Sequence, residues 1–165
     1  MKNGENSAID DTTSVPRGLQ WSGFSKENSE IWTVDGVPLE FLTFVTNVED
    51  GQTILAEGIS NDPPTFRQGM QAGDVVDLFE ASLRALQYSQ VKASGLRPAK
   101  ASTQPAFRFD YSAFDGHGLA KRGTVLGIVD NGGRLNLVIY EGAKQHYFDL
   151  YIKSVEAILA SVELI

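Results

Sequence analysis

The chain has 165 residues, a formal net charge of −7 and no cysteine, which excludes disulfides, thiolate nucleophiles and cysteine-based zinc sites. The acidic balance argues against nucleic acid or an anionic membrane surface as the main partner, because both favour clustered Lys and Arg. Every apolar run is shorter than the roughly 18–20 residues that a membrane-spanning helix needs, so we expect no transmembrane segment and one globular domain.

The first half of the chain predicts a polar tail, a group of strands and a long loop. Residues 1–16 carry too few apolar side chains to offset the entropy lost on ordering, so we expect a disordered tail or tether before a single domain at residues 17–165. Alternating and β-branched side chains predict the strands, and Glu49-Asp50-Gly51 predicts a turn before the last of them. The expected strands are residues 18–24 (an edge strand), 31–35, 39–48 and 53–57, and the expected loop is residues 60–72.

Two amphipathic helices are expected, at residues 73–90 and 146–162. In the first, Asp74 is the expected N-cap, because its carboxylate can accept a backbone N–H bond at the positive helix end. The second begins without a recognisable capping residue. Their apolar stripes contain Val75, Val76, Leu78, Phe79, Leu83 and Leu86 in the first helix, and Phe148, Tyr151, Ile152, Val155, Ile158, Leu159 and Val162 in the second.

Between the helices the sequence predicts a meander of strands. Residues 97–100 form an edge strand or an extended loop, and residues 104–112 form a strand by strict alternation. Asn131-Gly132 lies between two apolar runs and predicts a hairpin turn, because both central residues of that turn need positive φ. The two runs, residues 119–129 and 134–140, are apolar on both faces.

Strands that are apolar on both faces need cover on both faces. The two amphipathic helices can supply that cover if they pack on opposite sides of one antiparallel sheet. The sequence therefore predicts the α+β class, as an α/β/α sandwich with about 5–7 strands and two main helices.

Five segments of the chain carry a resemblance to a known family: Glu30-Ile-Trp-Thr-Val-Asp-Gly, Pro105-Ala-Phe-Arg-Phe-Asp-Tyr, Lys121-Arg-Gly, Tyr147-Phe-Asp-Leu-Tyr and Ile158-Leu-Ala-Ser-Val. In these segments the chain resembles the PsbP-like family, a fold shared with a Ran-binding nuclear import factor. The resemblance covers about residues 30–165 and is most similar to bacterial envelope lipoproteins. It implies the soluble part of a periplasmic or other cell-envelope lipoprotein, tethered in its precursor and working by binding; no family site residue maps onto this chain.

Catalytic and metal-binding patterns are weak. His117 lies in an expected turn and His146 opens the second helix, and Asp110, Asp115 and His117 match no metal-ligand spacing. Nucleophile-elbow and phosphate-loop patterns do not occur. We therefore expect no catalytic residue, no metal and no cofactor. An enzyme site built from Arg67, Asp110, His117 or His146 is an alternative.

The remaining candidates belong to a recognition surface. Trp32, Phe66, Arg67, His146 and Tyr147 are the expected contacts for an envelope protein or a small ligand, since aromatic residues and Arg dominate binding energies. Core packing of Trp32 and loop-pinning by Phe66 are the structural alternatives. The sequence thus predicts a monomeric, non-catalytic binding or scaffolding module of the cell envelope, with a cytoplasmic protein-interaction domain as the alternative.

Overall fold

The computed structural model describes residues 13–14, 22–26, 29–55 and 61–164. Seven strands form one antiparallel sheet in the order β2-β3-β4-β8-β7-β6-β5, and two helices pack against it. A small second sheet pairs β1 with β9. The elements are β1 (Thr13–Ser14), β2 (Ser22–Lys26), β3 (Ser29–Thr33), β4 (Glu40–Val48), α1 (Ala72–Ala85), β5 (Ser89–Ala101), β6 (Gln104–Phe114), β7 (Ala120–Val129), β8 (Leu135–Ala143), α2 (Tyr147–Ala160) and β9 (Glu163–Leu164).

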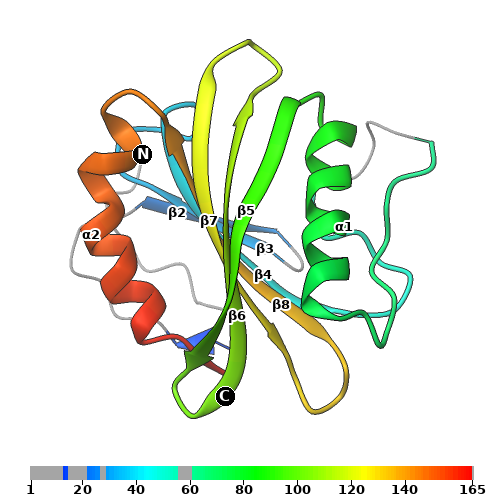
Figure 1. The fold of residues 1–165 in the computed structure, drawn as a ribbon. Helices are drawn as coiled ribbons and strands as arrows, with labels where there is room; N and C mark the ends of the chain where they lie inside the picture. The colour runs from blue at the N-terminus through cyan, green and yellow to red at the C-terminus, as the bar shows by residue number, and fades with distance from the viewer. Residues whose placement is uncertain (1–12, 15–21, 27–28, 56–60, 165) are drawn as a thin grey trace.

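The helices lie on opposite faces of the sheet, as Figure 1 shows. On one face, Val75 and Phe79 of α1 pack in a cluster with Phe109 of β6. On the other face, Val155 of α2 packs in a second cluster with Tyr140 of β8. The α/β/α sandwich and the strand number expected from the sequence are therefore confirmed.

Alternation along the strands assigns side chains to these two clusters. On β6, Phe109 and Tyr111 face α1, and Ala106 packs against the α2 cluster. On β7, Val125 lies in the α1 cluster and Leu126 in the α2 cluster. The inner strands are thus buried on both faces, as their apolar composition predicts.

A returning strand was expected at residues 53–57. This prediction is wrong for the three residues that the structure describes, because residues 53–55 lie outside any strand. β3 and β8 occupy the two edges of β4, so a returning strand has no free edge there. Instead, the chain after β4 is held to the long loop, where the Phe66 N–H donates to the Gln52 carbonyl at 2.8 Å. Residues 56 and 57 lie outside the described residues.

The first helix is shorter than expected. It ends with Leu86 as C-cap, and Gln87 adopts a φ of 70° before β5 begins. At the other end Gln71 is the N-cap, and Asp74 accepts the Gln71 backbone N–H at 2.9 Å. Asp74 therefore stabilises the helix start from the third helical position and is not the N-cap, which corrects that expectation.

Other boundaries shift by a few residues. Of the two expectations for residues 97–100, the edge strand is confirmed: these residues belong to the C-terminal part of β5, an edge strand of 13 residues that begins at Ser89. β2 ends at Lys26, two residues beyond the expected strand at residues 18–24, and β3 begins at Ser29, two residues before the expected strand at residues 31–35. Thr13 and Ser14 pair with Leu164 and Glu163, so for these two residues the structure differs from the expected disordered tail.

The position of α2 on its face depends on the turn that follows β8. His146 is the N-cap with φ 75° and ψ −56°, and the Tyr147 N–H donates to the Gln145 carbonyl at 2.9 Å. This is the strained form of the γ-turn. It folds α2 back over β8, where a Cβ on Gly142 would lie 2.7 Å from the Phe148 Cα.

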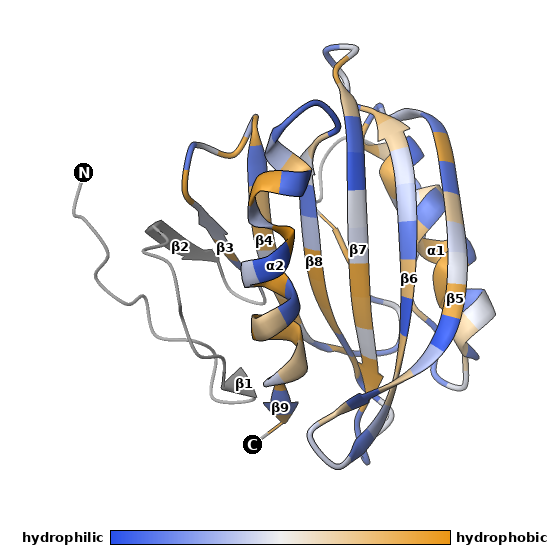
Figure 2. Cartoon of the chain, turned by 60° about the vertical axis from the view of Figure 1, so that its left-hand side comes forward, coloured by the Kyte–Doolittle hydropathy of each residue, from blue (hydrophilic) through white to orange (hydrophobic). Residues whose placement is uncertain are grey.

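As a result, α2 is displaced toward one side of the sheet. Figure 2 shows α2 in front of β4 and β8, with much of β5 and β6 uncovered on this face; only where the two strands meet, around Ala101 and Ala106, do they pack in the α2 cluster. α1 packs behind the opposite side of the sheet, where it contacts β5. Neither helix in the described ranges is long and apolar enough to cross a membrane.

Gly142→Ala should lower the free energy of unfolding by about 1–3 kcal/mol, because the added methyl group overpacks the backbone contact with α2. Gly73→Ala is the matched control, since its Cβ has no heavy atom within 4 Å in α1. That control should leave stability unchanged or raise it by up to about 1 kcal/mol. Urea denaturation measures both changes, and a Gly142→Ala protein as stable as the original would contradict this contact.

Candidate functional site

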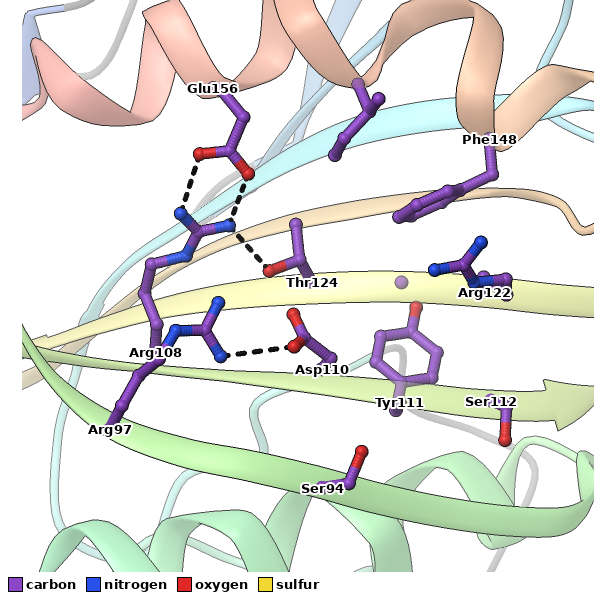
Figure 3. Close-up of a pocket in the computed structure, with 12 residues that line it drawn as sticks. Ser94, Arg97, Arg108, Asp110, Tyr111, Ser112, Arg122, Thr124, Phe148 and Glu156 are labelled. Atoms are coloured by element: carbon purple, nitrogen blue, oxygen red, sulfur yellow. Dashed lines mark hydrogen bonds and ion pairs between the residues drawn. The ribbon is translucent and has the colours of Figure 1, made fainter.

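A cleft of about 420 Å³ lies between α2 and strands β5, β6 and β7. Its volume falls within the range of small-molecule sites, roughly 300–1,000 Å³. α2 contributes Phe148, Ile152 and Glu156 to the lining. These residues are four positions apart and share one face of the helix. The cleft exists because α2 stops short of the outer strands, and Figure 3 shows the side chains that line it.

The floor of the cleft is a polar patch spanning three strands. Arg108, Asp110 and Ser112 occupy every second position of β6 and therefore share a face. In the sheet register Asp110 pairs with Ser94 and Thr124, and Ser112 pairs with Arg122. Directly opposed residues on neighbouring strands have adjacent side chains on the same face, so these polar groups converge below α2.

The back of the cleft is closed by an ion pair between the sheet and α2. Arg108 donates to both Glu156 carboxylate oxygens at 2.8 Å and to the Thr124 hydroxyl at 2.9 Å. Hydrogen bonds from Arg108 lower the pKa of Glu156. Bidentate pairs of this kind combine charge with fixed geometry. The pair therefore positions the middle of α2 above β6.

The other two arginines of the cleft are held less tightly. Arg97 donates to Asp110 at 3.1 Å and to the Gly95 carbonyl at 2.7 Å. Arg122 reaches Asp149 only at 3.5 Å, and its guanidinium carbon lies 4.4 Å from the centroid of the Phe148 ring. A cation above an aromatic face is oriented without using its N–H donors. Arg122 is thus the arginine best placed to bind a ligand.

A second polar cluster lies on the α1 face. The Glu141 carboxylate accepts the Tyr111 hydroxyl at 2.7 Å and the Tyr88 hydroxyl at 2.8 Å. Burial raises the pKa of all three groups. Lys121 lies 3.9 Å from Glu141 and donates to the Pro38 carbonyl at 2.6 Å. Because these buried groups satisfy one another, we interpret this cluster as a packing network that joins β6, β7 and β8 to Tyr88, which lies between α1 and β5.

Two of the expected binding residues do not present a surface. Trp32 is 0% exposed and donates to Glu30 at 2.7 Å, and Phe66 is 1% exposed in the α1 cluster. Their expected role as interface anchors is wrong in this structure, because both rings are occupied by the core. The core-packing and loop-pinning alternatives describe them correctly.

The other expected binding residues are accessible but do not form one site with the first two. Arg67 is exposed and lies 3.6 Å from Asp50 beside the long loop. His146 is exposed and its ring packs edge-on against Tyr147 at a centroid distance of 5.1 Å. Phe66 lies on the α1 side and His146 at the start of α2, so the sheet separates the two groups.

The alternative enzyme set is not assembled either. Asp110 faces α2 in the cleft, whereas Arg67 follows Phe66 on the α1 side. Asp115 accepts the His117 and Leu119 backbone N–H groups, each at 2.9 Å, and so closes its own turn. Within the residues that the structure describes, no three His, Asp or Glu side chains gather as a metal site.

Sequence reasoning missed the cleft residues Arg108, Ser112, Arg122 and Thr124. A signal was present: β6 carries a polar residue at every second position on a face that a helix was expected to cover. Arg122 and Thr124 continue this pattern on β7. Polar side chains below a helix indicate either buried ion pairs or an uncovered cleft, and the structure contains both.

The fold has a structural counterpart in a bacterial envelope protein. The chain is similar to the crystal structure of LpqN, which is involved in cell envelope biogenesis of Mycobacterium tuberculosis, with a TM-score of 0.52 and 10% identity. The match covers 92% of this chain and 82% of LpqN. No protein-family model matches the chain, and no curated protein matches its sequence. The chain therefore shares its fold with an envelope protein, and membership of the PsbP-like family stays a prediction.

Glu156→Gln tests the ion pair that closes the cleft. Because the folded pKa of Glu156 lies below its usual 4.5, the pair should stabilise the protein above that pH and lose this effect as the pH falls. At pH 7 the substitution should lower stability by about 1 kcal/mol or less, since Glu156 is half exposed. Denaturation at pH 7 and pH 3, with exposed Glu49→Gln as the charge control, measures the difference. A deficit that persists undiminished at pH 3 would contradict the assignment.

Proposed function

We propose that this protein is a non-catalytic binding domain of the bacterial cell envelope that holds a small polar ligand in the cleft below α2. The observation that carries the proposal is the cleft itself. It combines converging hydrogen-bonding groups with the apolar side chains of Phe148 and Ile152. Pockets of this size and mixed lining are the default binding sites of globular domains.

The envelope location is supported by the structural counterpart. LpqN is described as involved in cell envelope biogenesis, and its fold covers almost the whole of this chain. The acidic composition fits a solvated domain. We further propose that the domain is PsbP-like and that a lipid tethers its precursor to the membrane.

The chemistry of the cleft supports binding more than turnover. The carboxylates that line it, Asp110 and Glu156, are each engaged by an arginine. A general base needs a free carboxylate or imidazole within reach of the reacting proton, and both histidines of the chain lie outside the lining. Paired charges of this kind orient a ligand without reacting with it.

Ligand capture tests the proposal. The ¹⁵N-labelled protein is titrated with the low-molecular-weight polar fraction of cell-envelope extract, and amide shifts are mapped by NMR. We expect shifts at residues lining the cleft, and their loss in Ser94→Trp, because a large ring at this lining position fills the cleft. Leu96→Trp is the matched control, since Leu96 is exposed on the same strand outside the lining.

Three outcomes would contradict the proposal. Shifts that persist unchanged in Ser94→Trp would place the ligand elsewhere. A response to the cytoplasmic fraction alone would favour the cytoplasmic alternative. Mass spectrometry of the released ligand should recover it unchanged, and a chemically altered ligand would show that the domain is an enzyme.

A further inference from the structure

Two cations near the open end of the cleft take no part in the ion pairs at its back. In the sheet register Lys92 of β5 pairs with Ser112 of β6, and Ser112 pairs with Arg122 of β7. Because directly opposed residues share a face, the three side chains stand side by side on the α2 face of the sheet. Ser112 and Arg122 line the cleft, and Lys92 lies next to Ser112 outside the lining. We call Lys92, Ser112 and Arg122 the cationic row.

We propose that the cationic row binds a phosphate group of the ligand; this inference rests on the proposed function of the cleft. The outer cations lie two strand spacings apart, about 9–10 Å between backbones, with a hydroxyl group between them. Lys and Arg side chains are long enough to contact a group held between them across this span. A phosphate dianion offers two charges and several acceptor oxygens, which match two cations and one hydroxyl.

The three positions are accessible and their cations are lightly engaged. Lys92, Ser112 and Arg122 are all exposed. Asp149 opposes Arg122 but lies 3.5 Å away and is itself 71% exposed, so water screens this pair and it contributes little. Asp110 lies one register row further in and is engaged by Arg97 at 3.1 Å.

The surroundings of Arg122 also favour the binding of an anion. Arg122 pairs in register with Gly142, and Gly142 touches the first turn of α2. The positive end of the helix dipole therefore adds to the potential at this end of the row. Phe148 supports the guanidinium plane from the same turn, as Figure 3 shows. Phe148 thus orients the guanidinium, and Asp149 engages only one of its N–H donors, at 3.5 Å.

The two ends of the cleft differ in the charge that they present to a ligand. At the back, Arg108 is neutralised by Glu156 and is 16% exposed. At the mouth, Arg122 is 46% exposed and weakly paired. This division favours a ligand whose phosphate lies at the mouth and whose neutral or polar remainder lies against Ile152 and Thr124 deeper in the cleft.

Phosphate titration tests the inference directly. Inorganic phosphate and glycerol phosphate are added to the ¹⁵N-labelled protein at pH 7.5, with amide shifts expected at residues 92, 112 and 122. Lys92→Gln and Arg122→Gln should each weaken binding by about tenfold, because each removes one charge-assisted contact. Lys153→Gln removes the same charge from an exposed site on α2 and should leave binding unchanged. Lys92 and Arg122 are both exposed and are substituted separately, so if one variant fails to fold the other still tests the site.

The source of the phosphate is distinguished by a second arm. Co-sedimentation with phosphatidic acid vesicles, lost in both row variants, would assign a lipid headgroup; binding of glycerol phosphate without co-sedimentation would assign a soluble monoester. Absent or diffuse shifts up to about 50 mM phosphate, or equal weakening in Lys153→Gln, would overturn the inference, because a two-cation site binds in the millimolar range or tighter. If extract ligand still shifts the cleft while the row variants have no effect, the proposed function stands and the phosphate site falls.

Discussion

Contact between the first turn of α2 and Gly142 on β8 sets the position of everything on that face of the sheet. Only a residue without a side chain lets the helix backbone approach so closely, since a Cβ would lie 2.7 Å from the Phe148 Cα. The γ-turn at His146 leads the chain directly from β8 into this contact. The bidentate pair of Arg108 and Glu156 then secures the helix further along. Together these contacts leave the part of β5 and β6 around Lys92 and Ser112 uncovered on the α2 face.

The two helices cover opposite faces of the sheet and are displaced toward opposite sides of it. One corner of the sandwich, the outer part of β5 and β6 on the α2 side, is therefore left open. α1 packs behind β5, so the outer strands are supported from the α1 side and remain free on the α2 side. A chain with a net charge of −7 places three arginines in that corner. Electrostatic focusing in a cleft attracts ligands of opposite sign, so an anion is the natural complement of this site within an otherwise acidic protein.

Much of this fold could be predicted because hydrophobic alternation decides which face each strand residue occupies. The opposite directions of Phe109 and Arg108 followed from the sequence, and so did the need for a helix on each face. The lateral position of α2 could not be predicted, because it depends on one glycine and one positive φ at His146. The cleft was missed for that reason. Trp32 and Phe66 were misjudged because their burial depends on packing between segments distant in sequence.

The central claim is that α2 leaves β6 open at Ser112 while α1 covers the opposite face of the strand at Ala113. Thiol labelling measures this difference most directly. The chain has no cysteine, so Ser112→Cys and Ala113→Cys each introduce a unique thiol, one on each face of β6. The account predicts rapid reaction of Ser112→Cys with a maleimide and reaction at least about tenfold slower for Ala113→Cys, because a buried thiol reacts only through local opening. Protection of Ser112→Cys, or equal rates at both positions, would contradict an open cleft below α2.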